Sequence, residues 1–359
     1  MRVVVTGASG NVGTALLRVL RADGCEIVGI ARRAPDPACE PYSAARWVSC
    51  DIGAAGSVET LRAACAGADA LVHLAWAIHP RRGDPPMRRT NETGTENVLR
   101  AAAETAVPHF VAASSCAAYT PADRWRRVSE EWQRSGVPGS AYSASKARLE
   151  RRLDRFEASN PEIRTARIRP CGIAQAESAA ELADWILPPW LPRWLLGRRL
   201  LPVPLWRDFR LQLVHSSDVA AAIGRIVRHR AAGAFNLAAE PTLHADALAT
   251  TFGGFRLPTP RAALHAAAWP GWWTGLQPLH PGWLALADRA CLLDSSKARG
   301  ELGWSPRFGA HEVCAELVSA MRAGRIGHSS PLAPARQIRV GRPSHQSQRP
   351  RGEHERDRW

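Results

Sequence analysis

The stretch from residue 3 to residue 13 reads Val3-Val4-Val5-Thr6-Gly7-Ala8-Ser9-Gly10-Asn11-Val12-Gly13 and contains the pattern T-G-x-x-G-x-x-G. Glycine at 7 permits a tight turn, glycine at 10 lets the backbone approach a pyrophosphate, and glycine at 13 lets a helix pack closely on a sheet. The N-terminus of that helix adds N–H groups and a positive dipole end, which favour an anion. The pattern therefore predicts a strand–turn–helix unit that binds a dinucleotide, and a turn that serves packing alone is the alternative. The residues expected to contact the cofactor here are Gly7, Ser9, Gly10, Asn11, Val12 and Gly13.

Short apolar runs alternate with amphipathic stretches through the first half of the chain, which is typical of a parallel sheet covered by helices. The predicted strands cover residues 2–5, 26–30, 70–74, 110–113 and 163–168. The predicted helices cover about residues 12–20, 93–104 and 141–158, and core-like segments return at 214–226 and 234–237. The expected fold class is α/β, a doubly wound Rossmann-type parallel sheet with a smaller C-terminal substrate lobe.

The character of the sequence changes after residue 173. Residues 1–173 are expected to form the nucleotide-binding core, which residues of about 211–240 complete. Residues 174–210 and 241–325 are rich in Trp, Leu and Pro and are expected to form the substrate lobe. Residues 326–359 consist mostly of Ser, Pro, Arg and His and are predicted to be a disordered basic tail.

The composition argues against several classes of function. The chain of 359 residues has a net charge of +14, and Lys146 and Lys297 are its only lysines. Its arginines are spread without an RNA-binding or zinc-finger signature, so a solvated surface is favoured over nucleic-acid binding. The eight cysteines form no C-x-x-C pair, which predicts a reduced cytoplasmic protein without a metal site. The longest uncharged run, residues 262–287, holds three prolines and three glycines, so we expect a buried lobe or an interfacial surface and no membrane span.

The end of the second predicted strand indicates which dinucleotide is bound. After residue 31 the chain continues Arg32-Arg33, with no acidic residue before Asp36. An acid in this position binds the ribose 2′-hydroxyl of NAD, whereas arginine accommodates the 2′-phosphate of NADP. Arg32 and Arg33 therefore favour NADP, with NAD as the alternative if these arginines are only solvated.

Tyr142 and Lys146 form the pattern Y-x-x-x-K on the third predicted helix, which places both side chains on one face. A phenol with a pKa near 10 is a poor acid or base at neutral pH. An ammonium about 4 Å away favours the phenolate by up to about 4 kcal/mol, or roughly three pKa units. With three tyrosines and two lysines in the chain, the number of chance pairs at this spacing is only about 0.02. We therefore expect Tyr142 to be a catalytic acid/base, assisted by Lys146, which also holds the nicotinamide ribose.

Five further polar or loop positions are candidates for the same site. Ser114 and Ser115 follow the strand at 110–113, at the end where open α/β sheets bind ligands. Ser115 is expected to hydrogen-bond the reacting oxygen, and a strand-end turn serine is the alternative. Asp51 and Ile52 are expected to meet the adenine, with a loop cap as the alternative for Asp51. Asn91 is either a helix cap or a support for the active-site lysine through water.

In the order of its motifs the chain resembles the extended short-chain dehydrogenase/reductase family, also called the NAD-dependent epimerase/dehydratase family, over about residues 1–320. The motifs are T-G-A-S-G-N-V-G at 6–13, H-L-A at 73–75, N-E-T-G-T-E-N-V-L at 91–99, Y-S-A-S-K at 142–146, R-P at 169–170, V-H-S-S-D-V-A at 214–220, L-D-S-S-K at 293–297 and E-L-G-W-S-P at 301–306. The resemblance implies a catalytic triad of Ser115, Tyr142 and Lys146. It further implies a homodimer and cofactor contacts from Leu74, Ala75, Ser114, Pro170 and Ile173.

The predicted lobe departs from the nucleotide-sugar members of that family. Such members usually carry R-P-x-N-V-Y-G-P, whereas residues 169–175 read R-P-C-G-I-A-Q, so Gly172 replaces the asparagine that meets the sugar nucleotide. Lobe packing explains the following tryptophans at least as well as substrate contact does: Trp185, Trp190, Trp194 and Trp206. The arginines that could meet an anion are Arg193, Arg198 and Arg199. His215 and Asp218 resemble acid/base residues, but the resemblance favours a structural role that ties the core to the lobe.

These observations favour an NADP(H)-linked reductase or dehydrogenase that transfers a hydride at a ketone or secondary alcohol of a fairly hydrophobic small metabolite. A nucleotide-sugar epimerase or dehydratase is the alternative. A non-enzymatic protein that senses NADP is the least favoured, because such relatives usually lack the Tyr/Lys pair.

Overall fold

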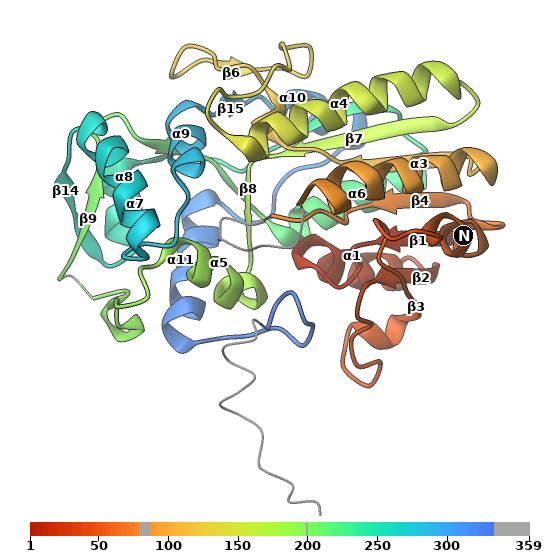
Figure 1. The fold of residues 1–359 in the computed structure, drawn as a ribbon, viewed down its shortest axis with the longest axis horizontal. Helices are drawn as coiled ribbons and strands as arrows, with labels where there is room; N and C mark the ends of the chain where they lie inside the picture. Colours follow the sequence, from red (N-terminus) through yellow and green to blue (C-terminus); the bar gives the residue numbers. More distant parts are fainter. Residues whose placement is uncertain (79–86, 199, 334–359) are drawn as a thin grey trace, which may run out of the picture.

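A computed structural model of the protein describes residues 1–78, 87–198 and 200–333. Its centre is a seven-stranded parallel sheet with the strand order β12-β7-β5-β4-β1-β2-β3 (Figure 1). The strands are β1 Arg2–Thr6, β2 Glu26–Ala31, β3 Ala45–Ser49, β4 Ala70–His73, β5 His109–Ala113, β7 Arg164–Pro170 and β12 Gly233–Leu237. The strand order reverses between β1 and β4, which is the point where an open α/β sheet binds its ligands. The predicted doubly wound Rossmann-type fold is confirmed.

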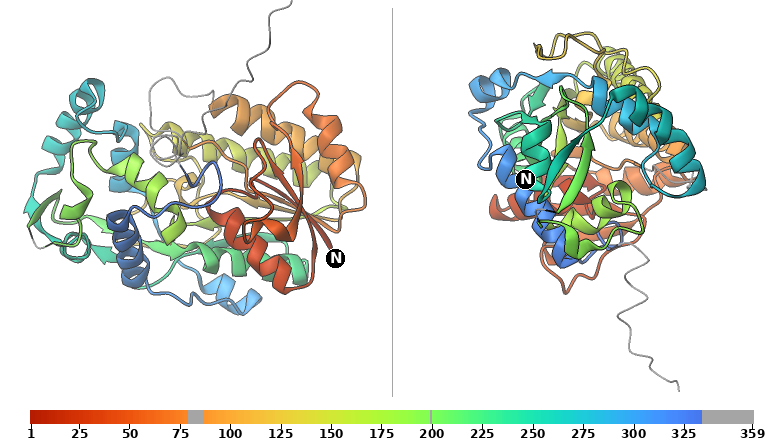
Figure 2. Two further views of the ribbon diagram at one scale, coloured as in Figure 1. Left: turned by 90° about the horizontal axis from the view of Figure 1, so that it is seen from below. Right: turned by 90° about the vertical axis from the view of Figure 1, so that its left-hand side faces the viewer.

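Helices cover both faces of this sheet (Figure 2), which explains why strands such as β1 and β2 are continuous apolar runs. The first face packs against α1 (Asn11–Ala22), α6 (Ser216–His229) and α10 (Ser296–Leu302). The second face packs against α2 (Ser57–Cys65), α3 (Thr95–Glu104) and α4 (Ala141–Ser159). Because Ala298, Leu302 and Trp304 lie in the sheet's own core, the segment around α10 belongs to the nucleotide-binding core and not to the lobe expected over 241–325.

A smaller lobe lies beside the sheet, at the left in Figure 1. Its helices are α5 Ala179–Ile186, α7 Ala245–Thr251, α8 Arg261–Thr274, α9 Pro281–Arg289 and α11 Ala310–Ala323. Its strands pair two by two: β8 Gly172–Ala174 with β11 Leu213–His215, β9 Leu201–Leu205 with β14 Gly254–Pro258, and β10 Arg210–Leu211 with β13 Leu243–His244. Another short pair, β6 Arg127–Val128 and β15 Leu292–Leu293, lies over the carboxyl-end loops. The lobe has a core of its own, centred on residues such as Leu196, Leu243 and Met321.

The first residues of the predicted disordered tail pack against the core. Leu332 is fully buried, and the Ser329 hydroxyl donates a hydrogen bond to the carbonyl oxygen of Ser9 at 2.7 Å. The prediction of disorder therefore does not hold for residues 326–333, since Ser329 is bonded to the glycine-rich turn and Leu332 is buried. Residues 334–359 of the predicted tail lie outside the described residues.

In the described part of the chain, no helix combines the length and the apolar character needed to cross a bilayer.

Candidate active site

The glycine-rich turn joins β1 to α1 at the centre of the sheet. Gly7 has a φ of 71°, and a Cβ there would lie 2.6 Å from the backbone nitrogen of Ala75, so a larger residue would force the turn apart. A Cβ at Gly13 would lie 2.3 Å from the carbonyl oxygen of Gly7, which shows how closely the helix packs on the turn. Gly10 precedes the helix, and no side chain caps its N-terminus. This combination is a cradle that fits a pyrophosphate.

Three other residues of the turn connect it to the rest of the molecule. The side-chain Oδ1 of Asn11 accepts a hydrogen bond from the Ser216 hydroxyl at 2.6 Å. The backbone carbonyl oxygen of Asn11 accepts one from Gln175 Nε2 at 3.1 Å. Ser9 is buried beneath the tail segment, and Val12 packs against the core. The turn is therefore fixed to the start of α6 and to the entry of the lobe.

Buried hydrogen bonds fix the carboxyl ends of β1 and β4 beside the turn. The His73 ring bonds to Thr6 Oγ1 at 2.7 Å and to Thr95 Oγ1 at 3.1 Å. Burial, with the Lys146 ammonium as a second cause, lowers the pKa of His73 to about 3. The ring is thus neutral at physiological pH and uses both nitrogens to hold the scaffold.

The first turn of α4 positions Tyr142 relative to the loop after β5. Ser140 caps the helix, since its hydroxyl accepts a hydrogen bond from the backbone N–H of Ser143 at 3.3 Å. The Ser143 hydroxyl in turn donates to the carbonyl oxygen of Ala117 at 2.6 Å. Because Ala117 lies in the turn whose N-cap is Ser115, these bonds hold Tyr142 and Ser115 in one place.

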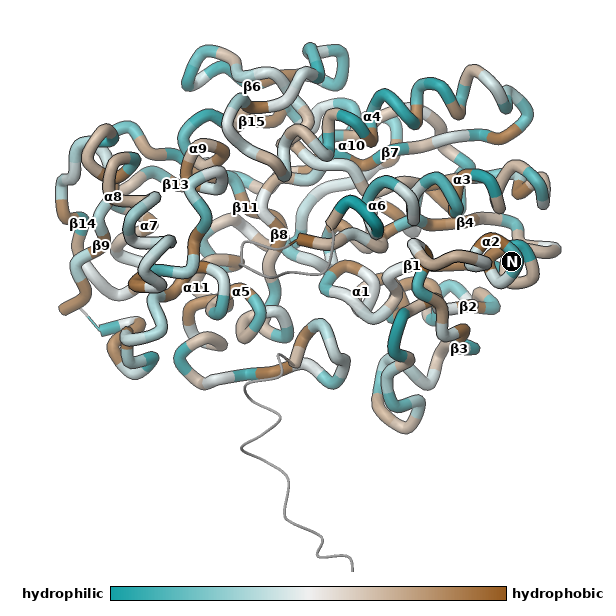
Figure 3. Tube along the Cα trace, in the orientation of Figure 1, coloured by the Kyte–Doolittle hydropathy of each residue, from teal (hydrophilic) through white to brown (hydrophobic). Residues whose placement is uncertain are grey.

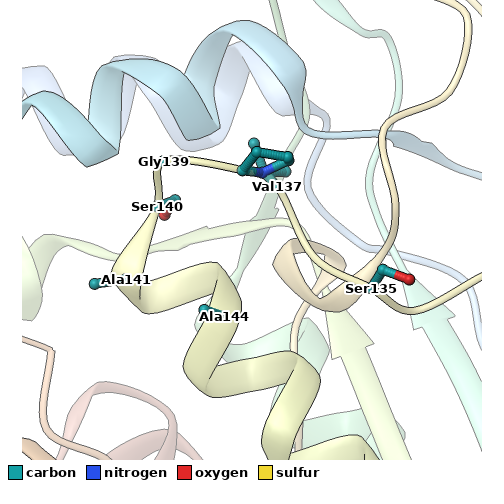
Figure 4. A pocket seen from close by; sticks show the side chains of 7 residues that line it. Ser135, Val137, Gly139, Ser140, Ala141 and Ala144 are labelled. Atoms are coloured by element: carbon teal, nitrogen blue, oxygen red, sulfur yellow. The ribbon is translucent and has the colours of Figure 1, made fainter.

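A shallow depression lies along the loop that leads into α4 (Figure 4). Its volume is about 310 Å³, and its lining includes Ser135, Val137, Gly139, Ser140 and Ala144. No predicted catalytic residue lines this depression, so we do not assign the reaction to it.

The Tyr142 phenol is adjacent to the Ser115 hydroxyl. Burial raises the pKa of Tyr142 above its ordinary value, and a hydrogen bond with Ser115 opposes this rise. The expectation that Lys146 lowers the pKa of the phenol is not met, because burial dominates and the ammonium lies 5.9 Å from the Tyr142 ring centre. The phenol is therefore protonated at neutral pH, as a proton donor must be. On its other side, the ring stacks on Trp283 of α9 with centroids 4.8 Å apart.

The Lys146 ammonium is held between a carbonyl group and an aromatic ring. Lys146 Nζ donates to the carbonyl oxygen of Ala113 at 2.9 Å and lies 3.7 Å from the centroid of Trp76. Burial lowers the pKa of Lys146 to about 7, while the Glu150 carboxylate partly opposes this shift. Charged and neutral forms of the lysine therefore coexist near neutral pH.

A buried ion pair lies one helical turn behind Lys146. Glu150 is fully buried, and Arg169 donates to its two carboxylate oxygens at 2.8 and 2.9 Å. Burial alone would raise the pKa of Glu150, but Arg169 outweighs it and lowers the pKa to about 2. Arg169 also donates to the Tyr119 hydroxyl at 2.8 Å and to the carbonyl oxygen of Glu130 at 2.7 Å. The network fixes α4 against β7 and the loops above the sheet.

The residues expected to select the cofactor have different environments. Arg32 and Arg33 are exposed beyond the end of β2, and neither guanidinium forms an ion pair within the described residues. Asp51 accepts hydrogen bonds from the backbone N–H of Gly53 at 3.1 Å and from Arg89 at 2.8 Å. The loop-cap alternative for Asp51 is therefore present in the structure.

Of the two roles considered for Asn91, the structure excludes that of a helix cap. Asn91 is buried within the π-helical turn Arg89–Gly94, where its side chain accepts from the Ala77 backbone N–H at 2.7 Å and donates to the Ala77 carbonyl oxygen at 3.0 Å. Its side chain thus holds the backbone beside Trp76, and the support of Lys146 through water stays a prediction. The other expected cofactor neighbours lie along the carboxyl edge: Leu74 and Ala75 after β4, Ser114 after β5, Pro170 at the end of β7, Ile173 in β8, and Ile52, buried after β3.

The lobe tryptophans do not share one role. Trp206 is a core residue, packed edge-on against Phe209, and Trp185 is half-buried. Trp190 and Trp194 are 65% and 57% exposed, so the lobe-core interpretation is wrong for these two.

The remaining lobe candidates are engaged mainly in structural contacts. Arg193 lies 3.8 Å from Asp184, Arg198 lies over the Trp194 ring, and Arg199 is outside the described residues. His215 Nε2 lies 3.2 Å from a Glu316 oxygen on α11. Asp218 accepts a hydrogen bond from the backbone N–H of Phe308 at 3.2 Å. His215 and Asp218 therefore tie α6 to the lobe side, as the resemblance implies.

Three neighbours of the site were not predicted from the sequence. Trp76 directly follows the motif at 73–75, so its position at a strand end was a usable signal. Glu150 lies four residues after Lys146, and helical periodicity places it next to the lysine. Trp283 reaches Tyr142 only through the folding of the lobe, and no local signal marks it.

Comparison with known proteins agrees with this architecture. The model of the NAD dependent epimerase/dehydratase family matches residues 3–238. The chain therefore belongs to this family of NAD-dependent enzymes.

Relatives differ in length and in what is known of them. An uncharacterised protein of Mycobacterium tuberculosis H37Rv is 29% identical over 330 residues, which cover 91% of this chain but 31% of that protein. This chain thus spans about a third of the length of its mycobacterial relatives. A 4-hydroxy-2-methyl-3-oxo-4-farnesyl-3,4-dihydroquinoline-1-oxide ketoreductase of Stigmatella aurantiaca is 31% identical over 204 residues, covering 56% of this chain and 59% of that protein. The solved UDP-glucose 4-epimerase of Thermus thermophilus, a complex with NAD, shares the fold at 22% identity and a TM-score of 0.65, covering 90% of this chain and 99% of its own.

Proposed function

We propose that the protein is an NADP(H)-linked reductase or dehydrogenase that acts on a ketone or secondary alcohol of a hydrophobic small molecule. The observation that carries the proposal is the meeting of Ser115, Tyr142 and Lys146 at the carboxyl edge of the sheet, with the Tyr142 ring packed on Trp283 from the lobe. Polar groups that can transfer a proton thus lie next to an apolar wall, which suits a ketone on a hydrophobic molecule.

The glycine turn and the arginines after β2 support the choice of cofactor. NADP(H), when bound, would supply or accept the hydride. The Gly7–Gly13 turn would hold its pyrophosphate at the uncapped start of α1, and Arg32 and Arg33 would face the 2′-phosphate. Both guanidinium groups have no ion-pair partner among the described residues, so their charge is available for a phosphate.

The three polar side chains divide the proton chemistry of a reduction. Tyr142 donates its phenol proton to the carbonyl oxygen, while the Ser115 hydroxyl donates a hydrogen bond that orients the same oxygen. The hydrogen bond with Ser115, which opposes the rise in the pKa of Tyr142, stabilises the phenolate left after the transfer, and Lys146 on the same helix face would hold the nicotinamide ribose. In the oxidation of an alcohol, the same groups act in reverse.

The surroundings of Tyr142 support a hydrophobic substrate. Ala117, Val137 and Leu286 form a small apolar cluster against which Tyr142 and Trp283 pack. The relative from Stigmatella aurantiaca is named for the reduction of a ketone that carries a farnesyl group. An apolar wall gains free energy from each methylene group it removes from water.

The experiment is a panel assay that follows absorbance at 340 nm with NADPH and a set of hydrophobic ketones. We expect steady consumption of NADPH with at least one lipophilic ketone. Conversion of a nucleotide sugar with no net change in NADPH, and no turnover of any ketone, would overturn the proposal.

One observation favours a second candidate, a nucleotide-sugar epimerase or dehydratase. Arg124, Arg210 and Arg261 meet around Asp288 at a depression of about 260 Å³, and Arg210 Nε is buried without a partner within the described residues. Such a set of guanidinium groups suits a diphosphate. Thermal-shift measurements with UDP- and dTDP-sugars test this candidate, and no stabilisation by any of them would remove it.

A further inference from the structure

Large apolar side chains are exposed at the far end of the lobe. Of the twelve large hydrophobic residues that are exposed in the described chain, nine lie in the segments 186–200, 255–257 and 269–276. We call the surface formed by six of them the tryptophan face: Trp190, Trp194, Leu200, Phe255, Trp269 and Trp273. A soluble monomer rarely gathers so many exposed apolar residues in one place without a partner for them.

Helix α8 lies at this end of the lobe and is largely apolar. Its 14 residues read R-A-A-L-H-A-A-A-W-P-G-W-W-T, and none of them is buried. Arg261 and His265 face Asp288, whereas the rest of the helix exposes mainly alanine and tryptophan, and such an apolar surface normally contacts protein or lipid. Figure 3 shows the hydrophobic colouring along much of α8.

The exposed segments form one continuous surface. The Trp190 indole N–H donates to the carbonyl oxygen of Leu276 at 2.8 Å, which ties the first segment to the end of α8. The Gly197 backbone N–H donates to the carbonyl oxygen of Phe252 at 2.9 Å, and β9 pairs with β14. Trp269 and Trp273 stack with centroids 5.4 Å apart. This end of the molecule faces the viewer on the right of Figure 2.

The charge around the tryptophan face is net positive. The segments 181–208 and 246–289 contain seven arginines and five acidic residues. Acidic residues pair with some of the arginines: Asp184 lies 3.8 Å from Arg193, and Asp246 lies 2.7 Å from Arg256.

Two arginines keep an uncompensated charge at this end. Arg198 and Arg207 are exposed and form no ion pair within the described residues. Asp208, which follows Arg207 in sequence, pairs with Arg124 at 2.5 Å, and Asp288 pairs with Arg124 at 2.8 Å. The surface thus combines exposed indole rings with net positive charge.

We propose that the tryptophan face binds the surface of an anionic phospholipid bilayer. Indole rings favour the headgroup level of a membrane, where the ring is shielded from water and its N–H stays hydrated. Arginines that border such rings are attracted to lipid phosphates. The binding is peripheral, in accordance with the absence of a spanning helix among the described residues.

A second copy of the chain fits this surface less well than a bilayer does. A two-fold interface places a surface against itself, so Arg198 and Arg207 would face like charges. The lipid proposal does not depend on the reaction proposed above, since it uses no residue of the candidate active site.

The experiment is sedimentation of the full chain with vesicles of phosphatidylcholine alone or of phosphatidylcholine mixed with phosphatidylglycerol. The test variants are Trp269→Ser combined with Phe255→Ser, and Arg198→Glu. The matched control is Trp125→Ser, which changes an equally exposed tryptophan (50%) far from the tryptophan face in sequence and outside its segments. Thermal melting and light scattering check the fold and the oligomeric state of each protein.

We expect the unchanged protein and the control to sediment with the mixed vesicles, and the double variant to bind them on the order of tenfold or more weakly. The Arg198→Glu variant should lose binding to the mixed vesicles and behave like the unchanged protein on phosphatidylcholine alone. Absence of binding to the mixed vesicles by the unchanged protein would overturn the proposal. Dissociation of a dimer by the double variant, without any vesicle binding, would assign the surface to a second copy instead.

Discussion

Lys146 Nζ lies 3.7 Å from the centroid of the Trp76 ring, with the carbonyl oxygen of Ala113 as its hydrogen-bond acceptor. The backbone next to Trp76 is held by the two hydrogen bonds between Asn91 and Ala77, so the indole ring could leave Lys146 only by a rotation of its own side chain. An ammonium with an aromatic cover and one acceptor has little access to water, and its pKa is about 7 for this reason. This relationship sets the charge of the lysine in the proposed catalytic set.

Replacing Lys146 should change how the stability of the protein depends on pH. The pKa of this lysine is about 7 in the folded protein and 10.5 in its ordinary state, so between these values the unfolded chain binds more protons than the native chain. The free energy of unfolding should therefore gain a positive contribution as pH rises through this window. Lys146→Met should lose that contribution. Denaturant unfolding at neutral pH and about two pH units higher checks it, and an identical pH dependence in both proteins would contradict it.

Removing the aromatic cover should raise the pKa of Lys146. Trp76→Ala loses a cation–π contact of about 0.5–2 kcal/mol, which by itself lowers the pKa of Lys146. The ammonium also becomes hydrated again, and this raises the pKa by more, because burial lowers it by several pKa units. Because the chain has only two lysines, ¹³C labelling at lysine Cε gives two signals, and Lys297 serves as the internal reference. Trp125→Ala is the control. An unchanged or lower pKa for Lys146 in the Trp76 variant would refute the role given to burial.

The arginines after β2 should decide between the two dinucleotides. Loss of charge-assisted hydrogen bonds worth about 1.5–3 kcal/mol predicts that Arg32→Ser combined with Arg33→Ser weakens NADPH binding roughly 10- to 100-fold. Binding of NADH should stay nearly constant. Fluorescence titration measures both, with Arg46→Ser as a control because Arg46 is exposed on the neighbouring strand. Equal weakening for both dinucleotides would show that the arginines do not read the 2′-phosphate.

The tail segment that packs on the glycine turn should support cofactor binding. Ser329→Ala removes the buried hydrogen bond to the Ser9 carbonyl oxygen, which costs about 1 kcal/mol of stability. Because Ser9 lies within the turn, we expect several-fold weaker NADPH binding as well. Ser330→Ala changes the next residue and is the control. NADPH affinity and melting temperature that match the unchanged protein would argue against this support.

The parts of the fold that short-range patterns determine could be predicted from the sequence. The strand, tight turn and helix around Gly7 and Gly13 follow from local backbone requirements, and the structure reproduces them. The i,i+4 spacing of Tyr142 and Lys146 likewise follows from helical geometry.

The rest depends on which segments meet in space, and local patterns do not contain that information. Burial, opposed by the hydrogen bond with Ser115, raises the pKa of Tyr142, and burial is a property of the packed lobe and core. Leu332 lies in a segment of polar composition but is buried by the turn and its surroundings. The opposite holds for Trp190 and Trp194, whose composition predicts a core but whose position is the lobe surface.

The most direct test of the proposed chemistry is the Tyr142→Phe variant, measured for NADPH binding by fluorescence and for ketone reduction at 340 nm. Tyr42→Phe is the matched control, since that phenol bonds to Thr14 at 3.2 Å in a different part of the core. Because Tyr142 donates the proton in this account, the Tyr142→Phe variant should bind NADPH normally but reduce the ketone about 10²- to 10⁴-fold more slowly. The Tyr42→Phe control should keep its rate. An unchanged rate of reduction in Tyr142→Phe would contradict the account.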